Sequence, residues 1–231
     1  GQWRCWYEYG MGALGDWGAH IIDTAHRFLE LGLPEEVNPV YLKDHNPFFF
    51  PMSSTIEFKF PKRGDMPPCV ITWYDGLDNI PAVPEGYGVQ ELDPNIPLVA
   101  GQKIQPSKLN PGKEIYSKTL TFKGGTHGSP LTIIPEADAK KMEGKLPQVP
   151  EANGNHYHNF LRACLGQEEV HSPFSVTGPL SQVFCLGVIA QWTGHKIIFD
   201  RETKQIVNDP IANQLLWGPV PREGWAEYYK I

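Results

Sequence analysis

The stretch Gly10-Met-Gly-Ala-Leu-Gly-Asp-Trp-Gly-Ala-His-Ile-Ile-Asp23 determines which fold and which chemistry are expected of this 231-residue chain. Its first six residues, GMGALG, have the G-x-G-x-x-G spacing of a dinucleotide-binding loop, and Glu35 and Glu36 follow about 20 residues later, as that motif requires. The same stretch also contains a helical pattern of polar residues. The surrounding sequence distinguishes these two interpretations.

The surroundings of the glycines disfavour a nucleotide loop. Such a loop follows a buried parallel strand rich in Val, Ile and Leu, whereas the preceding residues, Arg4-Cys-Trp-Tyr-Glu-Tyr9, are charged and aromatic. Asp16 would place a carboxylate beside the phosphates at the helix N-terminus, and Glu35 and Glu36 precede the predicted strand Val37–Lys43 instead of ending it. We therefore expect this chain to bind no nucleotide.

A polar stripe on the following helix is the more informative feature. Apolar spacing predicts a helix over about 13–31, and Asp16, His20 and Asp23 fall at i, i+4 and i+7 on one face, which Arg27 extends by a turn. A carboxylate one turn from an imidazole can orient the ring and favour proton uptake. The stripe thus predicts an acid/base pair, Asp16 and His20.

Two other interpretations of these residues stay open at this point. The stripe is also compatible with a solvated helix face that carries local ion pairs. A metal site is disfavoured, because His26 is out of phase with His20 and a third ligand is needed. The cysteines form no CxxC pair, so neither a zinc site nor a disulfide framework is expected, and we interpret them as small core residues: Cys5, Cys69, Cys164 and Cys185.

Composition excludes several classes of partner. Apolar residues make up 41% of the chain and charged residues 20%, as in ordinary globular proteins. The formal net charge of −6 leaves no basic footprint for nucleic acid or for an anionic membrane surface. We find no apolar run near the roughly 18 residues that a membrane span needs.

The remaining pattern predicts an α+β fold in a single domain, residues 1–231. Strands are predicted at Val37–Lys43, Ser54–Phe60, Cys69–Tyr74, Ile115–Phe122 and Leu131–Ile134, and a closing hairpin at Lys196–Phe199 and Gln205–Val207. Helices are predicted at about 153–165 and 177–194, with Pro179 in the first turn of the second. A Pro- and Gly-rich excursion occupies about 77–114. Consecutive strands with few helices between them favour a mixed sheet over a βαβ array.

The stretch 10–23 resembles the G-G-G-x-L-x-D-x-G-x-H-x-x-D helix of the glucose-fructose oxidoreductase, inositol dehydrogenase and rhizopine-catabolism (Gfo/Idh/MocA) family. Five further motifs look like a branch common in Bacteroidetes and Planctomycetes: Trp3-Arg4, Arg63-Gly-Asp-Met-Pro-Pro68, Thr72-Trp-Tyr-Asp-Gly76, Asn208-Asp-Pro-Ile-Ala-Asn213 and Arg222-Glu-Gly-Trp225. Each motif is weak alone, but their combination is specific, and the resemblance covers essentially the whole chain.

This resemblance implies that half of an enzyme lies outside the chain. The family joins an N-terminal Rossmann domain, which holds NAD or NADP, to a C-terminal α+β domain whose open, largely antiparallel sheet carries helices on one face. The chain looks like the second domain alone, because it has neither the nucleotide-binding glycines nor the lysine of the family's E-K-P motif. We expect the free sheet face to form a homo-oligomer. The location, cytoplasmic or exported, is left open.

The resemblance also implies roles for the polar stripe. In the family, the residues matching Asp16 and His20 lie beside substrate and nicotinamide, and the histidine is the acid/base on a sugar or polyol hydroxyl. Asp23 matches the last acid of the motif, and we interpret it as structural, paired with Arg27.

Other residues are weaker candidates for contacts with substrate. Arg4, together with Trp3, could bind a hydroxyl or carboxylate, or could be a surface arginine stacked on Trp3 or Trp6. His156 and His158 lie near the start of the predicted helix at 153–165, where either could line the pocket. That helix is expected to bury a stripe made of Tyr157, Leu161 and Cys164. His127, in a glycine-rich turn, is assigned a loop role.

The expected function is therefore that of the substrate domain of an NAD(P)-dependent dehydrogenase for sugars or polyols. An alternative keeps the fold but uses the cofactor transiently, in an NAD-assisted glycosidase or lyase. A third possibility is a non-catalytic binding or oligomerisation module.

Overall fold

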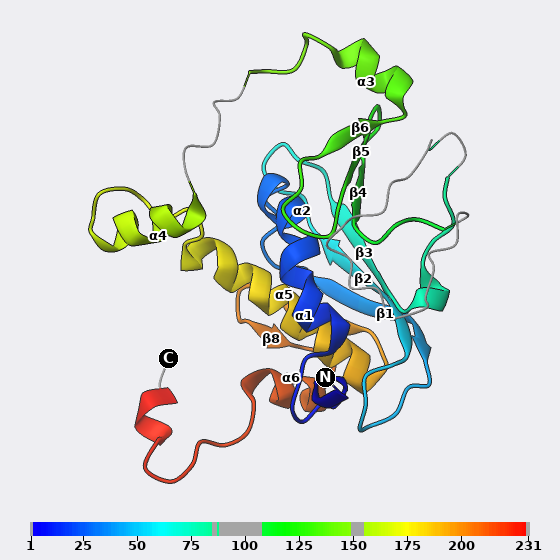
Figure 1. Cartoon of the computed structure of the whole chain (residues 1–231). Coiled ribbons are helices and arrows are strands. Elements are labelled where there is room, and N and C mark those ends of the chain that lie inside the picture. The colour runs from blue at the N-terminus through cyan, green and yellow to red at the C-terminus, as the bar shows by residue number, and fades with distance from the viewer. Residues whose placement is uncertain (1, 85–86, 88–107, 149–154, 230–231) are drawn as a thin grey trace. The chain divides into compact units, whose positions relative to one another are not determined.

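The computed structural model describes residues 2–84, 87, 108–148 and 155–229 (Figure 1). The chain divides into two compact units. Unit 1 consists of Gly1–Gly18, Leu29–Asn79 and Gln182–Ile231, and unit 2 of Ala19–Phe28 and Ile80–Ser181. Helices α1 (Gly12–Ile21) and α5 (Phe174–Thr193) each contribute residues to both units.

Unit 1 is built on an antiparallel five-stranded sheet with the strand order β3-β2-β1-β7-β8. Its strands are β1 (Glu36–Lys43), β2 (Ser53–Phe60), β3 (Cys69–Asp75), β7 (Ile197–Asp200) and β8 (Gln205–Ile206). The alternating Ile56, Phe58 and Phe60 of β2 are buried on one face, where Trp73 lies opposite Ile56 and Val37 opposite Phe58. The predicted α+β class and these strands are confirmed.

Helices α1 and α5 cover that buried face of the unit 1 sheet (Figure 1). A Cβ added to Gly187 of α5 would lie 2.4 Å from Leu14 of α1 and 2.7 Å from Phe58 of β2. A Cβ on Gly18 of α1 would lie 2.8 Å from Phe184 of α5. Leu14 and Phe58 are fully buried. The two helices and the sheet therefore meet where only glycine leaves enough room.

The opposite face of this sheet mixes aromatic and charged side chains. The strand register places Tyr41 and Tyr74 on either side of Thr55, and both tyrosines are exposed. Lys59 and Glu36 are paired on the same face, with 2.6 Å between Nζ and Oε1. This exposed face of the sheet is therefore only partly apolar, because every second residue of β2 is polar.

Unit 2 contains an antiparallel three-stranded sheet with the order β4-β5-β6. Its elements are β4 (Lys113–Tyr116), β5 (Thr121–Gly124), β6 (Thr132–Ile134), α2 (Asp23–Phe28), α3 (Glu136–Met142) and α4 (His156–Cys164). The prediction of one strand at 115–122 was wrong. The hydroxyl of Ser117 accepts the Leu120 N–H, which closes a turn and makes this segment a hairpin.

Two helix boundaries also differ from the prediction. The helix expected over 13–31 is two helices, since α1 ends at Ile21 and α2 begins at Asp23. Helix α5 begins at Phe174, because the carbonyl of Pro173 accepts the N–H groups of Val176 and Thr177. Pro179 consequently lies inside α5.

Most of the excursion predicted at 77–114 lies outside the described residues. Of its described parts, Leu77–Asn79 form a short 3-10 helix (η2) and Lys113 begins β4. Short 3-10 helices also occur at Gln2–Cys5 (η1) and Ala226–Tyr229 (η3). The sequence prediction missed α3 and α6 (Pro210–Trp217), although Asp209-Pro210 is a typical helix start.

Among the helices of the described residues, α5 is the one long and apolar enough to cross a membrane by length and composition. Its residues Val183, Leu186 and Ala190 are fully buried within unit 1. A core helix that is apolar all round has the same length and composition. We therefore describe α5 as a core helix, and the expectation that no segment spans a membrane stays a prediction.

The close helix packing leads to a stability prediction. Gly187→Ala should lower the free energy of unfolding by about 1–3 kcal/mol, because the new methyl group overlaps Leu14 and Phe58. Gly178→Ala is the matched control on the same helix, since its Cβ would meet nothing within 4 Å. That variant should change stability by less than about 1 kcal/mol. Urea unfolding measures both, and equal effects of the two substitutions would contradict the packing argument.

The N-cap of α6 leads to a pH prediction. The Asp209 carboxylate accepts the N–H groups of Ala212 and Ile211 and lies 2.7 Å from His195 Nε2, and these contacts, the Ala212 bond foremost, hold the pKa of Asp209 below its usual value. Because this pKa is lower in the folded chain, the ionised carboxylate stabilises the fold above about pH 4. That stabilisation is lost as the pH falls through the folded pKa.

Asp209→Asn keeps the cap acceptor and removes the charge. The parent chain should therefore exceed Asp209→Asn in stability at pH 7, and the difference should shrink as the pH approaches 3. Asp209→Ala should lose about 0.5–2 kcal/mol across this range, because the cap itself is gone. Urea unfolding at several pH values measures these differences. A gap between the parent and Asp209→Asn that does not change with pH would exclude the proposed contribution.

Candidate functional site

The glycines at the start of α1 are packed against protein atoms. A Cβ on Gly10 would lie 2.7 Å from the Cα and carbonyl oxygen of Arg4. Gly12 has φ +60, and its Cβ would lie 2.6 Å from the ring of Phe50. Glycine at positions 10 and 12 thus allows the chain to fold back closely on itself. This packing explains the glycine spacing without a bound ligand.

Arg4, Trp3 and Asp16 come together in unit 1. Arg4 Nε lies 3.6 Å from Asp16 Oδ2, and the Arg4 guanidinium lies 5.3 Å from the centre of the Trp3 ring. Both charged side chains are about half exposed, so the ion pair contributes at most about 1 kcal/mol. Of the two stacking partners considered for Arg4, the structure selects Trp3, and Trp6 packs against Phe49 instead.

His20 belongs to the last turn of α1, within unit 2, and its side chain is exposed. Its ring lies 4.8 Å from the ring of His127, with 44° between the ring planes. His127 follows β5 in the loop before β6, where Nδ1 lies 3.0 Å from Thr126 Oγ1. The loop role assigned to His127 from the sequence therefore missed its position beside the predicted acid/base.

A buried lysine links the backbones of these two histidines. Lys113, the first residue of β4, is only 8% exposed. Its Nζ donates hydrogen bonds to the carbonyl of His127 (2.8 Å), the carbonyl of His20 (3.2 Å) and Oγ1 of Thr24 (3.1 Å). Burial of an ammonium group is costly unless such acceptors surround it. The lysine thus connects β4, the end of α1, α2 and the β5–β6 loop within unit 2.

The other members of the polar stripe have different surroundings. Asp23 is the first residue of α2, where a carboxylate favours the helix N-terminus. Arg27 is exposed, and its Nη1 lies 3.5 Å from the carbonyl of His171. The structural role of Asp23 stays a prediction.

His156 and His158 lie in the first turn of α4, which Asn155 caps by accepting the Tyr157 N–H. Both histidine side chains are exposed, and the His156 ring lies 4.0 Å from that of Tyr157. Within the described residues, no hydrogen bond or ring contact joins either histidine to His20. The structure therefore does not assemble these candidates into one site.

The buried stripe predicted for this helix was wrong. Tyr157 and Leu161 are 68% and 59% exposed, and Cys164 is exposed as well. The residue that α4 buries is Asn159, whose amide donates to the carbonyl of Glu169 and accepts the N–H of His171. A polar anchor for the following loop thus replaces the expected apolar contact. Cys5 is also exposed, so the core role expected of all four cysteines was wrong for Cys5 and Cys164.

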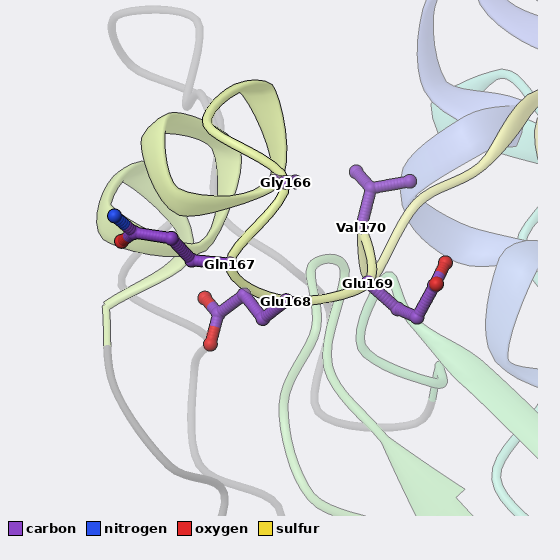
Figure 2. A pocket seen from close by; sticks show the side chains of 6 residues that line it. Gly166, Gln167, Glu168, Glu169 and Val170 are labelled. Carbon is purple, nitrogen blue, oxygen red and sulfur yellow. The ribbon is translucent and has the colours of Figure 1, made fainter.

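The loop held by Asn159 borders an open hollow (Figure 2). The hollow is lined by Ala163, Gly166, Gln167, Glu168, Glu169 and Val170. Figure 2 shows the side chains of Glu168 and Glu169 extending in different directions. None of the residues predicted for catalysis or substrate binding lines this hollow, so the predicted site and the hollow are separate features.

A second buried polar cluster lies in unit 1. Asp75 accepts hydrogen bonds from the backbone N–H and hydroxyl of Ser54 and from Trp73 Nε1, and Gln191 of α5 donates to the same hydroxyl. Burial raises the pKa of Asp75, and these hydrogen bonds oppose the rise. Burial also raises the pKa of Tyr7, and the Asp75 charge adds to this effect. The Thr72–Gly76 motif thus supplies the carboxylate that joins β3 to Ser54 of β2, and the hydroxyl of Ser54 accepts the hydrogen bond from α5.

Comparisons with known proteins leave the family resemblance unsupported. No protein-family model matches the chain, and no curated protein matches it. Within the residues that the structure describes, no group of three or more His, Cys, Asp or Glu side chains is placed to hold a metal ion. The geometry around α1 and the resemblance of the sequence motifs are therefore the two features that point to a function.

Proposed function

We propose that this chain is the substrate-binding and catalytic domain of an NAD(P)-dependent oxidoreductase that acts on a hydroxyl group of a sugar or polyol. The observation that carries the proposal is the position of His20 on α1. Leu14 and Gly18 of this helix are buried, whereas Asp16 and His20, one turn apart, are exposed. The helix is thus held by packing while its polar side chains remain accessible to substrate.

The role of His20 follows from the chemistry of alcohol oxidation. As the carbon gives up a hydride, the hydroxyl must lose its proton to a base within hydrogen-bond reach. His20 accepts this proton, and Asp16 orients the imidazole from one helical turn away. Arg4 and Trp3 adjoin Asp16 within unit 1 and remain candidates for binding a hydroxyl or carboxylate group.

The cofactor site is expected outside this chain. The residues around Gly10 and Gly12 do not fit a dinucleotide, because protein atoms occupy the space beside both glycines. A bound nicotinamide would supply the hydride acceptor, and in the proposed enzyme an N-terminal Rossmann domain holds NAD or NADP. The residues of this chain bind and orient the sugar or polyol and remove its proton.

The alternatives use the same residues differently. In an NAD-assisted glycosidase or lyase, His20 would remove a proton and later return it, so that no net NADH accumulates. In a binding or oligomerisation module, Asp16 and His20 would be a solvated helix face. Net NADH production separates the first alternative from a dehydrogenase, and the effect of replacing His20 separates the second.

The kinetic test replaces His20 in the full-length protein. His20→Ala should lower kcat by about 10²–10⁴-fold, because a general base is removed. Folding should be nearly unchanged, since the side chain is exposed. Asp16→Asn should lower the plateau of the pH–rate profile, because the imidazole loses the carboxylate that is proposed to orient it. Glu8→Gln, which replaces another exposed carboxylate, serves as the control. A kcat within about threefold of the parent for His20→Ala would exclude His20 as the acid/base.

We also propose that the exposed face of the unit 1 sheet forms a homo-oligomer. Tyr41, Tyr74 and Val70 are exposed there, and aromatic side chains are enriched in protein interfaces. Val70→Asp should shift the protein to a smaller species by light scattering. Val220→Asp is the control, because Val220 is equally apolar and 91% exposed but belongs to the segment after α6. A parent protein that is already monomeric at tens of micromolar would contradict this proposal.

A further inference from the structure

We propose that Lys113 is a positioning residue that holds His20 and His127 together as a two-histidine site, and that His127 binds the hydroxyl next to the one on which His20 acts. The substrate class is then a vicinal diol within a sugar or polyol. This inference rests on the proposed function for the role of His20. The placement of Lys113 and His127 is an independent structural observation, so the two parts can be tested separately.

Lys113 binds to the end of helix α1. Carbonyl groups in the last turn of a helix have no partner within the helix. The carbonyl of His20 belongs to this turn, because α1 ends at Ile21, and it accepts a hydrogen bond from the Lys113 ammonium. A cation at this end also interacts favourably with the helix dipole. Lys113 therefore holds the turn that carries the proposed acid/base.

The same ammonium group of Lys113 also binds to the β5–β6 loop and to α2. One of its hydrogen bonds goes to the carbonyl of His127 (2.8 Å), and another goes to Thr24 in the first turn of α2. A single buried charge thus holds the backbones of both histidines and both sides of the α1–α2 break. Removing this charge would leave carbonyl groups without their donor, which is costly in a buried place.

The rings of His20 and His127 lie close together. With 4.8 Å between ring centres, two imidazoles can each reach a different oxygen of one small molecule. The oxygens of neighbouring hydroxyl groups lie within hydrogen-bond distance of each other. A vicinal diol that lies against the edges of both rings can therefore bind to both imidazoles, whereas an isolated hydroxyl can bind to only one of them.

The first experiment tests the positioning role without activity. The full-length protein is labelled with ¹³C at histidine Cε1, and the two resonances are assigned by their loss in His20→Gln and His127→Gln. Lys113→Met should shift both resonances, and Thr24→Val, which removes a single acceptor, should shift them less. Lys118→Met is the matched control, since Lys118 is exposed in the β4–β5 turn. Circular dichroism establishes that each variant is folded.

The second experiment tests the diol. Cis-1,2-cyclohexanediol should perturb both histidine resonances of the parent protein, whereas cyclohexanol at the same concentration should perturb mainly one. With the substrate identified, His127→Ala should raise KM about tenfold with a smaller change in kcat. Lys113→Met should lower kcat at least tenfold, and Lys118→Met should change neither kcat nor KM.

Each outcome decides one part of the inference. If Lys113→Met is folded and its two histidine resonances have the same chemical shifts as in Lys118→Met, the positioning role is overturned. If Lys113→Met fails to fold, the resonances of Thr24→Val are compared with those of Lys118→Met, and equal positions overturn the positioning role. If the diol and the monohydric alcohol act alike, or if His127→Ala leaves KM unchanged, the vicinal-diol assignment is overturned. If His20→Ala keeps a kcat close to that of the parent while Lys113→Met still shifts both histidine resonances, the proposed function is refuted and the positioning role of Lys113 stands.

Discussion

The close contact between α1, α5 and β2 is the constraint on which unit 1 depends. Leu14, Phe58 and Gly187 meet at distances that no larger residue at 187 would permit. Burial of the surrounding apolar side chains supplies the driving force, while the glycines allow the helices to approach closely enough to exclude water. This contact also determines which face of α1 is buried. Asp16 is left exposed as a direct consequence.

Each unit also contains a polar group whose burial is compensated by several hydrogen bonds. In unit 1 this group is the Asp75 carboxylate, which receives donors from Ser54 and Trp73. In unit 2 it is the Lys113 ammonium, which donates to three acceptors. Buried charges are expensive, so they persist only where the surrounding chain supplies matching partners. Asp75 joins strands to a core helix, whereas Lys113 lies beneath the histidines of the proposed site.

The Lys113 network connects the fold of unit 2 to its proposed chemistry. A catalytic base must be held in a defined place, and a restraint on the backbone of its helical turn contributes to this. The backbone hydrogen bond from Lys113 to His20 provides such a restraint without covering the ring. The proposed acid/base is therefore positioned through its carbonyl group, while its side chain is exposed.

The sequence by itself determined the elements whose signals are local. The alternation of Ile56, Phe58 and Phe60 predicted a strand with one buried face, and the spacing of Asp16 and His20 placed them one turn apart on a helix. These predictions succeeded because residue periodicity reflects backbone geometry directly. Asp209-Pro210 was an equally local signal that could have predicted α6. The break between α1 and α2 was not predicted. Lys113, which is distant in sequence, forms hydrogen bonds on both sides of this break, and local periodicity does not reveal such contacts.

Only the tertiary structure decided which distant residues meet. His127 looked like a turn residue, and nothing in its neighbourhood indicates that it lies beside His20. The expected stripe on α4 failed because apolar spacing shows which residues share a face but not whether another element covers that face. Lys113 gave no sequence signal, because the hydrogen bonds that make its burial tolerable come from segments far apart along the chain. Local periodicity thus defined the helices and strands, whereas long-range packing and the satisfaction of buried charge defined the candidate site.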